Sequence, residues 1–233
     1  MFVGVLLGDA HIRKVGLDKA YITFEQSKDK VGYINYLHQL ASEGGYKVGD
    51  IREYNRIRKT ALLPMLTQGK DSSTLDNNTE SLNIKTDTID PLKLSEVLAQ
   101  KKTESLYFRT ESSTELRPLA DAFLSSEGKK VVPSNIADML TLRGLAFWIM
   151  DDGQQVKKGG VTLCTDSFGS DEVSLLREVL SSKFDLSTSI HRKTSKDKSS
   201  IYERIYIKKE SLDEIKPELK PHMHESMYYK IHE

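Results

Sequence analysis

The chain carries the same pattern twice. An apolar run closed by an acid ends at Asp9 in "FVGVLLGD", and a similar run, "LAFWIMDD", ends at Asp152, 143 positions further on. Each run is followed by a segment that is typical of a strand and then a helix, and Ser27 in the first such segment lies 140 positions before Ser167 in the second. A repeat at a nearly constant offset indicates one structural unit used twice. The sequence therefore predicts two similar halves.

The repeat continues at a shorter offset. Pro118 in "ELRPL" lies 99 positions before Pro217 in "EIKPEL", and Lys130 in "GKKVVP" lies 100 positions before Lys230 in "YYKI". The fall in the offset from 143 to 100 implies about 43 additional residues in the first half.

These additional residues form a polar insertion at about 64–104. Ser, Thr, Asn and Asp dominate it and favour turns and solvated loops. Residues 71–104 carry seven acidic side chains against four lysines, a net charge near −3. The end of the insertion, "PLKLSEVLAQKK", is compatible with a short helix that has Pro91 in its first turn. We predict an N-terminal half over 1–130, which contains this insertion, and a C-terminal half over 131–233.

Hydrophobic periodicity predicts the same order of elements in both halves, namely a helix with a terminal acid, two strands, a helix, two strands and a helix. The expected strands lie near 11–15, 20–26, 50–60 and 105–110 in the first half, and near 155–158, 160–166, 187–194 and 201–208 in the second. Besides the first acid-terminated run, helices are expected near 30–42, 113–125, 142–151 (the second such run), 170–183, 210–218 and 221–231. The fold class is therefore α+β, with two pseudo-equivalent halves.

Basic and aromatic residues alternate along corresponding strands of the two halves. Because side chains alternate across a strand, such residues share one sheet face. This face is either an ordinary solvated surface or one suited to a duplex, where phosphates fix the register and base edges give specificity. The residues are Arg52, Tyr54, Arg56 and Arg58 in one strand, and Tyr202, Arg204, Tyr206 and Lys208 in the other, opposite Ile201, Ile205 and Ile207.

Composition limits the other possibilities. The 34 basic and 34 acidic side chains balance, which by itself speaks weakly against a nucleic-acid partner, although the chain outside the insertion is modestly basic. A single cysteine, Cys164, excludes an internal disulfide framework and a cysteine-rich metal cluster. No apolar run approaches the roughly 20 residues of a membrane span, and no signal or transit peptide is expected at the N-terminus.

The two apolar helices require a joint explanation. Each carries an early glycine, Gly4 or Gly144, where the missing side chain would let two helix backbones approach closely. If the helices pack together, Asp9 and Asp152 emerge side by side. Two such carboxylates repel each other unless a cation lies between them or one is protonated, and hard divalent cations such as Mg²⁺ prefer oxygen ligands.

These helices resemble the paired motifs of the LAGLIDADG homing endonucleases, specifically the single-chain, two-motif branch encoded in organelle introns. "LAFWIMDDG" is identical to the signature at its first two and last two positions, and "FVGVLLGDA" matches it more loosely through Gly4 and Asp9. The resemblance covers essentially the whole chain, including "YFRTES", "GKKVVPSNI" and "MYYKI". It implies two halves related by a pseudo-twofold axis, whose antiparallel sheets form a DNA-binding saddle.

The resemblance also implies the chemistry. Site-specific cleavage of both DNA strands would use Mg²⁺ or Mn²⁺, with Asp9 and Asp152 as catalytic metal ligands and Gly8 and Asp151 beside them in the metal site. Lys130 and Lys230, which the repeat already pairs, would be the catalytic lysines.

The expected partner is double-stranded DNA with a long recognition site, bound by a monomer in a mitochondrion or chloroplast. From the strand faces and the resemblance, we predict DNA contacts from Arg13, Lys14, Arg52, Tyr54, Arg56, Arg58, Arg109, Lys157, Lys158, Arg192, Lys193, Tyr202, Arg204, Tyr206 and Lys208.

Several alternatives stay open. A protein of this fold can instead be a maturase that binds its host intron RNA, or a noncatalytic organelle RNA-binding protein, although retention of both acids and both lysines favours the nuclease. Asp151 is expected to have a backbone or interface role, Phe147 and Trp148 to be core residues, and "HMH" at 222–224 to begin a helix. Because the first motif starts at residue 2, either the chain was cut from a longer precursor or its first half is minimal.

Overall fold

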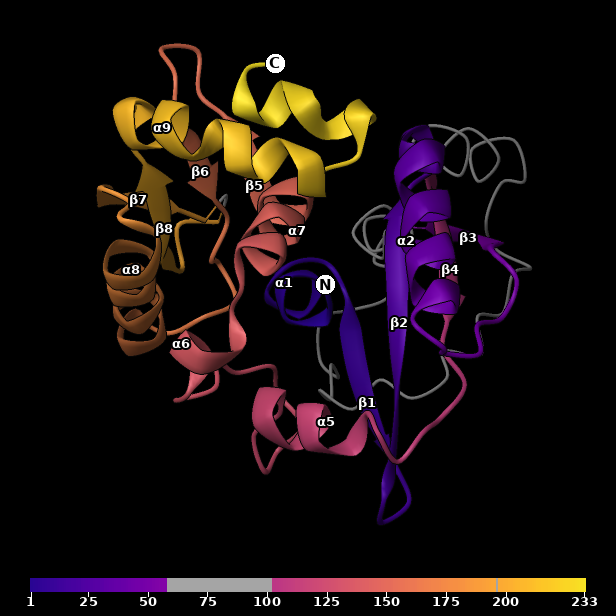
Figure 1. Cartoon of the computed structure of the whole chain (residues 1–233). Coiled ribbons are helices and arrows are strands. Elements are labelled where there is room, and N and C mark those ends of the chain that lie inside the picture. The colour runs from indigo at the N-terminus through magenta and orange to yellow at the C-terminus, as the bar shows by residue number, and fades with distance from the viewer. Residues whose placement is uncertain (58–101, 196) are drawn as a thin grey trace, which may run out of the picture.

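A computed structural model describes residues 1–57, 102–195 and 197–233 (Figure 1). Most of the predicted insertion lies outside the described residues, together with the short helix expected at its end and Arg58. Residues 102–104, which were expected to close the insertion, instead extend a strand, since Lys102 pairs with Ile57. No helix among the described residues is both long enough and apolar enough to cross a membrane.

The order of elements is the predicted one, apart from two short helices at 28–30 and 136–139 that were not expected. The first half comprises α1 (Phe2–Leu7), β1 (His11–Val15), β2 (Lys19–Ser27), the short 3-10 helix η1 (Lys28–Lys30), α2 (Val31–Glu43), β3 (Arg52–Ile57), β4 (Lys102–Arg109) and α5 (Arg117–Phe123). There follow α6 (Ile136–Met139), α7 (Leu142–Asp152), β5 (Gly153–Gln155), β6 (Val161–Leu163), α8 (Ser170–Phe184), β7 (Thr188–Thr194), β8 (Ile201–Ile207), α9 (Lys209–Leu219), η3 (Lys220–His222) and η4 (Glu225–Ile231).

Two predicted helices differ from the structure at their ends. The helix expected at 113–125 is limited to α5, which begins next to Pro118. The helix expected at 221–231 is instead two short 3-10 helices, η3 and η4, because the chain extends at Met223 between them. The prediction that "HMH" begins a helix is confirmed for His224, whose side chain caps η4 by accepting a hydrogen bond from the Ser226 backbone N–H.

Each half contains one four-stranded antiparallel sheet, and the two sheets have the same topology. The strand orders are β1-β2-β4-β3 and β5-β6-β8-β7. Figure 1 shows the sheets on opposite sides of α1 and α7, with further helices covering one face of each sheet. The predicted α+β fold with two equivalent halves is therefore confirmed.

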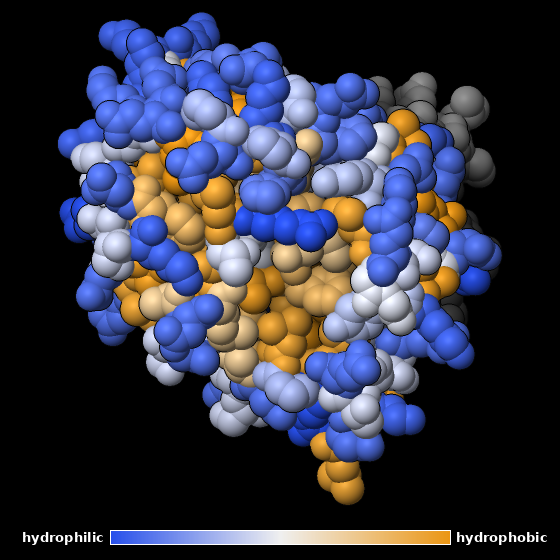
Figure 2. Space-filling model, viewed as in Figure 1, coloured by the Kyte–Doolittle hydropathy of each residue, from blue (hydrophilic) through white to orange (hydrophobic). Residues whose placement is uncertain are grey.

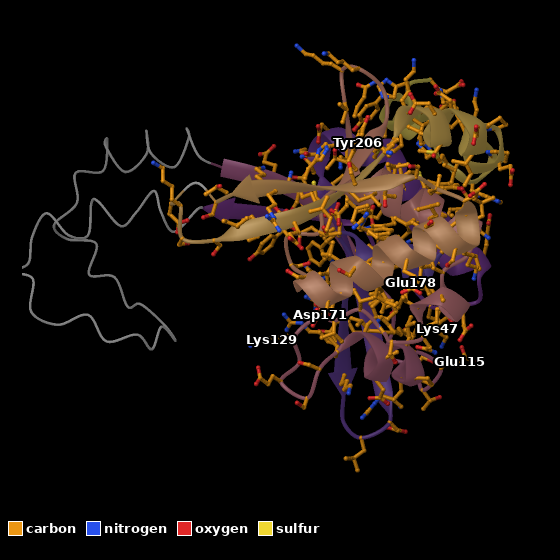
Figure 3. All side chains as sticks on the ribbon, turned by 90° about the vertical axis from the view of Figure 1, so that its left-hand side faces the viewer. Lys47, Glu115, Lys129, Asp171, Glu178 and Tyr206 are labelled. Carbon is orange, nitrogen blue, oxygen red and sulfur yellow. The ribbon has the colours of Figure 1, made fainter. Side chains whose placement is uncertain are left out.

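Alternation along the strands places the core between the sheets and their helices. In β2, Ala20, Ile22 and Phe24 are buried at every second position, and the Phe24 ring stacks on Phe108 with centroids 4.5 Å apart. Ile201 alternates onto the same strand face as Ile205 and Ile207, as predicted, but it is 66% exposed, so the buried part of this face does not extend to it. The β7–β8 hairpin extends beyond α8 at this end of the sheet (Figure 3).

The helices α1 and α7 join the two halves. A Cβ atom added to Gly4 would lie 1.9 Å from the backbone oxygen of Gly144, so the helix backbones are in contact, as the two glycines predicted. In α7 every residue from Gly144 to Asp151 is buried, including Phe147 and Trp148. A helix that is apolar on all sides is typical of such an enclosed position. At the other end, apolar side chains reach the surface around the N-terminus of α1, where Met1, Phe2 and Val3 are only partly buried (Figure 2).

Candidate active site

Asp9 and Asp152 come together at the C-terminal ends of the paired helices. Asp9 follows α1 by two residues, Asp152 is the last residue of α7, and both side chains are partly exposed. Burial and, next in size, the negative charge of Asp9 together raise the pKa of Asp152 to about 7. The predicted pair of carboxylates is therefore present, and the two groups repel each other when both are charged.

Lys130 and Lys230 occupy equivalent places next to these acids. The Nζ atom of Lys130 donates a hydrogen bond to the Gly8 carbonyl oxygen at 2.6 Å. The Nζ atom of Lys230 donates to the Asp151 carbonyl oxygen at 2.9 Å and also to that of Met150. Because Gly8 precedes Asp9 just as Asp151 precedes Asp152, the structure brings together the two lysines and two acids that the repeat had paired.

Burial changes the proton affinity of both lysines. The pKa of Lys130 is lowered from its usual value by burial. The pKa of Lys230 is lowered to about 8, first by burial and then by the positive charge of Lys30. At neutral pH the solution is therefore close to the pKa of the Lys230 ammonium group.

The side chain of Asp151 faces the other half of the molecule. It is buried, and its Oδ1 atom accepts hydrogen bonds from the Tyr33 hydroxyl at 2.8 Å and from Gln26 Nε2 at 3.1 Å. Its Oδ2 atom accepts one from the Asp9 backbone N–H at 3.3 Å. Burial and the Asp9 charge raise the pKa of Asp151 well above its usual range. The expected interface role is confirmed by these contacts.

Gln26 is a residue of this site that the sequence did not predict. It lies near the end of β2, buried, and its Nε2 atom also donates to Asp9 Oδ2 at 3.0 Å. The repeat contained the relevant signal, since Gln26 precedes Ser27 just as Asp166 precedes Ser167. Asp166 is therefore the counterpart of Gln26 in the second half.

The second half uses its counterpart position differently. Asp166 accepts two hydrogen bonds from the Arg204 guanidinium, with Nε at 2.6 Å, and Arg204 Nη1 donates to Gln154 at 3.0 Å. Arg204 was predicted to contact DNA from the outer sheet face, but it is only 8% exposed. A guanidinium held by a carboxylate in this way is oriented, and part of its charge is neutralised.

The outer face of the first sheet carries arginines and tyrosines. Arg13, Arg52 and Arg109 are exposed, and Tyr54 is 47% exposed. The Arg109 guanidinium lies over two tyrosine rings of this face, at 5.5 Å from the Tyr21 centroid and 5.7 Å from that of Tyr107. Arg56 lies in β3, where its backbone pairs with Thr103 of β4.

The second sheet has a similar outer face. Lys193 is exposed, Tyr202 is partly exposed and lies opposite it, and Tyr206 stacks on His191 with ring centroids 4.8 Å apart. The Tyr206 hydroxyl donates to the Gly159 carbonyl at 3.1 Å and so holds the β5–β6 turn (Figure 3). The remaining predicted contacts on this side, Lys157 and Lys158 in that turn and Lys208 after β8, are exposed.

Two predicted DNA contacts point to the other face of their strands. Lys14 alternates with Arg13 and pairs with Asp121 of α5 at 2.6 Å. Arg192 alternates with Lys193 and pairs with Glu203 at 3.3 Å. Since adjacent residues of a strand point in opposite directions, these two side chains do not belong to the outer surfaces described above.

A sequence model of the LAGLIDADG DNA endonuclease family matches residues 1–69 and 82–215. The chain belongs to this family. A second comparison shows 36% identity over 131 residues to the intron-encoded endonuclease ai4 of Dictyostelium discoideum, which covers 56% of this chain and 79% of that protein. The cytochrome b mRNA maturase bI2 of Saccharomyces cerevisiae is 27% identical over 243 residues, 98% of this chain but 45% of the maturase.

The fold is also that of a homing endonuclease. The homing endonuclease I-WcaI bound to its DNA recognition sequence superposes with a TM-score of 0.69 at 22% identity, over 99% of this chain and 83% of that one. At this identity the likeness establishes the fold alone. The function within the LAGLIDADG family therefore depends on the acids, the lysines and the sheet faces of this chain.

Proposed function

We propose that the protein is a site-specific endonuclease of the intron-homing type, which cleaves both strands of DNA. One observation carries the proposal: an acid and a lysine from each half converge, with equivalent hydrogen bonds, at the junction of the two sheets. A duplex has two strands to cut, and two equivalent sets of acid and lysine match them. The relative from Dictyostelium discoideum that is named as an intron-encoded endonuclease supports the same activity.

The outer sheet faces would bind the duplex. Arg13, Arg52 and Arg109 on one side and Lys193 on the other present charge to phosphates, and the neighbouring tyrosines add flat surfaces that can pack on sugars and bases. Phosphate contacts set the register and base contacts in the major groove give specificity. Arg204, which is fixed by Asp166, would contact the DNA from the outer face of the second sheet, at the end of that face that lies close to Asp152.

Asp9 and Asp152 fit a divalent cation. Their mutual repulsion is relieved by a positive ion, and hard ions such as Mg²⁺ or Mn²⁺ prefer carboxylate oxygen. Among the described residues no three His, Cys, Asp or Glu side chains form a metal cluster, so phosphate oxygens and water would complete the ligands. Gly8 and Asp151 would contribute through their backbone carbonyls. A bound ion would supply Lewis-acid stabilisation of the scissile phosphate and the departing 3′ oxygen.

The lysines would stabilise charge at the two cleavage positions. Each ammonium is held by a carbonyl that directly precedes an acid, so its position relative to Asp9 or Asp152 is fixed before DNA binds. A pre-positioned cation stabilises the charge that develops on a phosphate without reorganisation. Lys230, with its pKa near 8, can also hold or release a proton at Nζ near neutral pH.

A second function is supported by the maturases among the relatives, which are from two yeasts. In that case the outer faces or another surface would bind the host intron RNA without cleavage. The acids and lysines favour the nuclease, since an RNA-binding protein has no need of them. We expect the gene to reside in an organelle and the protein to act as a monomer, because one chain supplies both halves.

The deciding experiment is cleavage of a plasmid that carries the intronless insertion site of the gene surrounding this reading frame, in Mg²⁺. The intact chain should linearise the plasmid, whereas Asp9→Asn and Asp152→Asn should not. Asp138→Asn makes the same chemical change at an exposed residue of α6 and serves as the matched control. Absence of cleavage by the intact chain, together with tight binding to the intron RNA, would overturn the endonuclease in favour of the maturase.

A further inference from the structure

We propose that Asp151 is a positioning residue that fixes the Asp9 carboxylate through Gln26, across the boundary between the two halves. This inference rests on the proposed function, because it concerns the acid that would hold the metal. In the "DD" pair, Asp151 would position another residue, whereas Asp152 would bind the metal.

Among the described residues, the hydrogen bonds of the Asp151 side chain all lead to the first half. Tyr33 of α2 and Gln26 of β2 donate to its Oδ1 atom, and the Asp9 backbone N–H donates to its Oδ2 atom. Tyr33 is fully buried and Gln26 is 4% exposed, so water cannot readily replace either donor. Buried polar groups that are mutually satisfied in this way hold a single arrangement.

Gln26 transmits this arrangement to Asp9. Its Nε2 atom has two hydrogens and lies 3.1 Å from Asp151 Oδ1 and 3.0 Å from Asp9 Oδ2. Its Oε1 atom accepts a hydrogen bond from Lys30 Nζ at 3.1 Å, which fixes the orientation of the amide. The Asp9 carboxylate is therefore held by an amide whose position depends on Asp151.

The space for Asp151 exists because of a glycine. A Cβ atom added to Gly8 would lie 2.5 Å from Asp151 Cβ and 2.8 Å from Oδ2. Gly8 and Asp151 are equivalent positions of the two motifs, so only one of them can carry a side chain here. The asymmetry between "GD" and "DD" is thus a steric requirement of the helix pair.

The second half has no equivalent of the contact between Gln26 and Asp9 among the described residues. No described residue donates a side-chain hydrogen bond to the Asp152 carboxylate, and Asp166, the counterpart of Gln26, is engaged with Arg204. Asp9 is therefore positioned before DNA binds, whereas Asp152 depends on the ligands that bind at the site. This difference could not follow from a simple twofold repeat.

The test compares cleavage rates of Asp151→Asn, Gln26→Ala and the double variant, at saturating Mg²⁺, with Asp138→Asn as control. A displacement of about 1 Å at a reacting group costs on the order of 100-fold in rate, so we expect each single variant to be about 10- to 100-fold slower. Because both residues act along one path, the double variant should be no slower than the slower single variant. DNA affinity in Ca²⁺ should stay unchanged.

Tyr33→Phe provides a second variant if Asp151→Asn does not fold. It removes one donor to Asp151 Oδ1 and keeps the buried ring, so it should slow cleavage and show the same non-additivity with Gln26→Ala. Wild-type rates for Asp151→Asn or Tyr33→Phe, or rate losses that multiply in the double variants, would overturn the positioning role.

A readout without cleavage separates this inference from the proposed function. In ¹H–¹⁵N NMR spectra of the protein without DNA, Asp151→Asn should shift the Gln26 side-chain amide and the Asp9 backbone amide, and Asp138→Asn should not. Unchanged resonances would refute the inference even if the protein cuts DNA. If the protein cuts no DNA but these resonances shift, the proposed function fails while the contact network stands.

Discussion

Lys130 and Lys230 donate to carbonyl oxygens at equivalent positions of the two motifs, at 2.6 Å to Gly8 and 2.9 Å to Asp151. Each lysine therefore holds the carbonyl that directly precedes one acid, and we propose that each serves one cleavage position, although the charges of Asp9 and Asp152 act on both lysines. The offset of 100 residues had already paired the two lysines, and the proposed one-to-one relation makes the contributions of the two halves separable by substitution.

We expect Lys130→Met and Lys230→Met each to slow cleavage of one DNA strand. Loss of a single pre-positioned charge costs about 100- to 1,000-fold in rate at that strand, so each variant should accumulate nicked circular plasmid, with the nicks on opposite strands. Strand-specific end labelling measures this. Lys129→Met, next to Lys130 but exposed and paired with Glu127, should cut both strands normally. Equal slowing of both strands by either variant would contradict the one-to-one relation.

The raised pKa of Asp152 predicts how stability varies with pH. Its pKa of about 7 in the folded protein lies above the ordinary value of 3.8, so folding favours the protonated form. Its contribution to stability is therefore present below about pH 4 and is lost as the pH rises towards 7. Without metal, Asp152→Asn should raise the melting temperature at pH 8 and change it little at pH 4.

Metal should reverse this effect. A cation that binds the two carboxylates stabilises the folded state by mass action, so Mg²⁺ should raise the melting temperature of the intact chain at pH 8. Asp152→Asn, which removes a ligand, should show a smaller rise. The same melting temperatures of the intact chain with and without Mg²⁺ at pH 8 would argue against a metal held by these acids.

Much of the fold could be predicted because the repeat imposed strong constraints. The pairing of Asp9 with Asp152 and of Lys130 with Lys230 required only two offsets, and the contact between Gly4 and Gly144 followed from two glycines in apolar helices. Such features depend on residues that are close in sequence or on one fixed symmetry.

The parts that sequence reasoning missed depend on contacts between elements. Gln26 and Tyr33 are ordinary residues of a strand and a helix, and only the packing of α7 against the first half brings them to Asp151. Similarly, alternation placed Arg204 on the outer face correctly, but its burial results from Asp166 and Gln154, which are 38 and 50 residues away. A one-dimensional pattern gives the direction of a side chain and not its neighbours.

The two glycines of the helix pair should differ in their tolerance of alanine. A Cβ atom on Gly4 would lie 1.9 Å from the Gly144 backbone oxygen, which cannot move without separating the helices. A Cβ atom on Gly144 would instead meet the flexible end of Leu140 at 3.1 Å. Overpacking costs about 1–3 kcal/mol and more where backbone must shift. In urea unfolding, Gly4→Ala should therefore be destabilised by about 3 kcal/mol or more and Gly144→Ala by clearly less; equal losses would contradict the close approach.

Arg13 and Lys14 provide a neighbouring pair for testing which sheet face meets DNA. Arg13 is exposed on the outer face of β1, whereas Lys14 points to α5 and pairs with Asp121 at 2.6 Å. If Arg13 contacts a phosphate, Arg13→Ala should weaken binding and reduce the slope of log affinity against log salt by about 0.9. Lys14→Ala should lose only a surface ion pair, worth about 0–1 kcal/mol of stability, and keep the salt slope.

The measurement is DNA binding in Ca²⁺ over a series of salt concentrations, so that no cleavage occurs. Both variants remove one positive charge from adjacent residues, and any nonspecific effect of net charge is therefore matched between them. A reduced slope for Arg13→Ala alone places the duplex on the outer face. If Lys14→Ala lowers the slope as much, the duplex must reach the helix side of β1, and the proposed arrangement of DNA across the two sheets would be wrong.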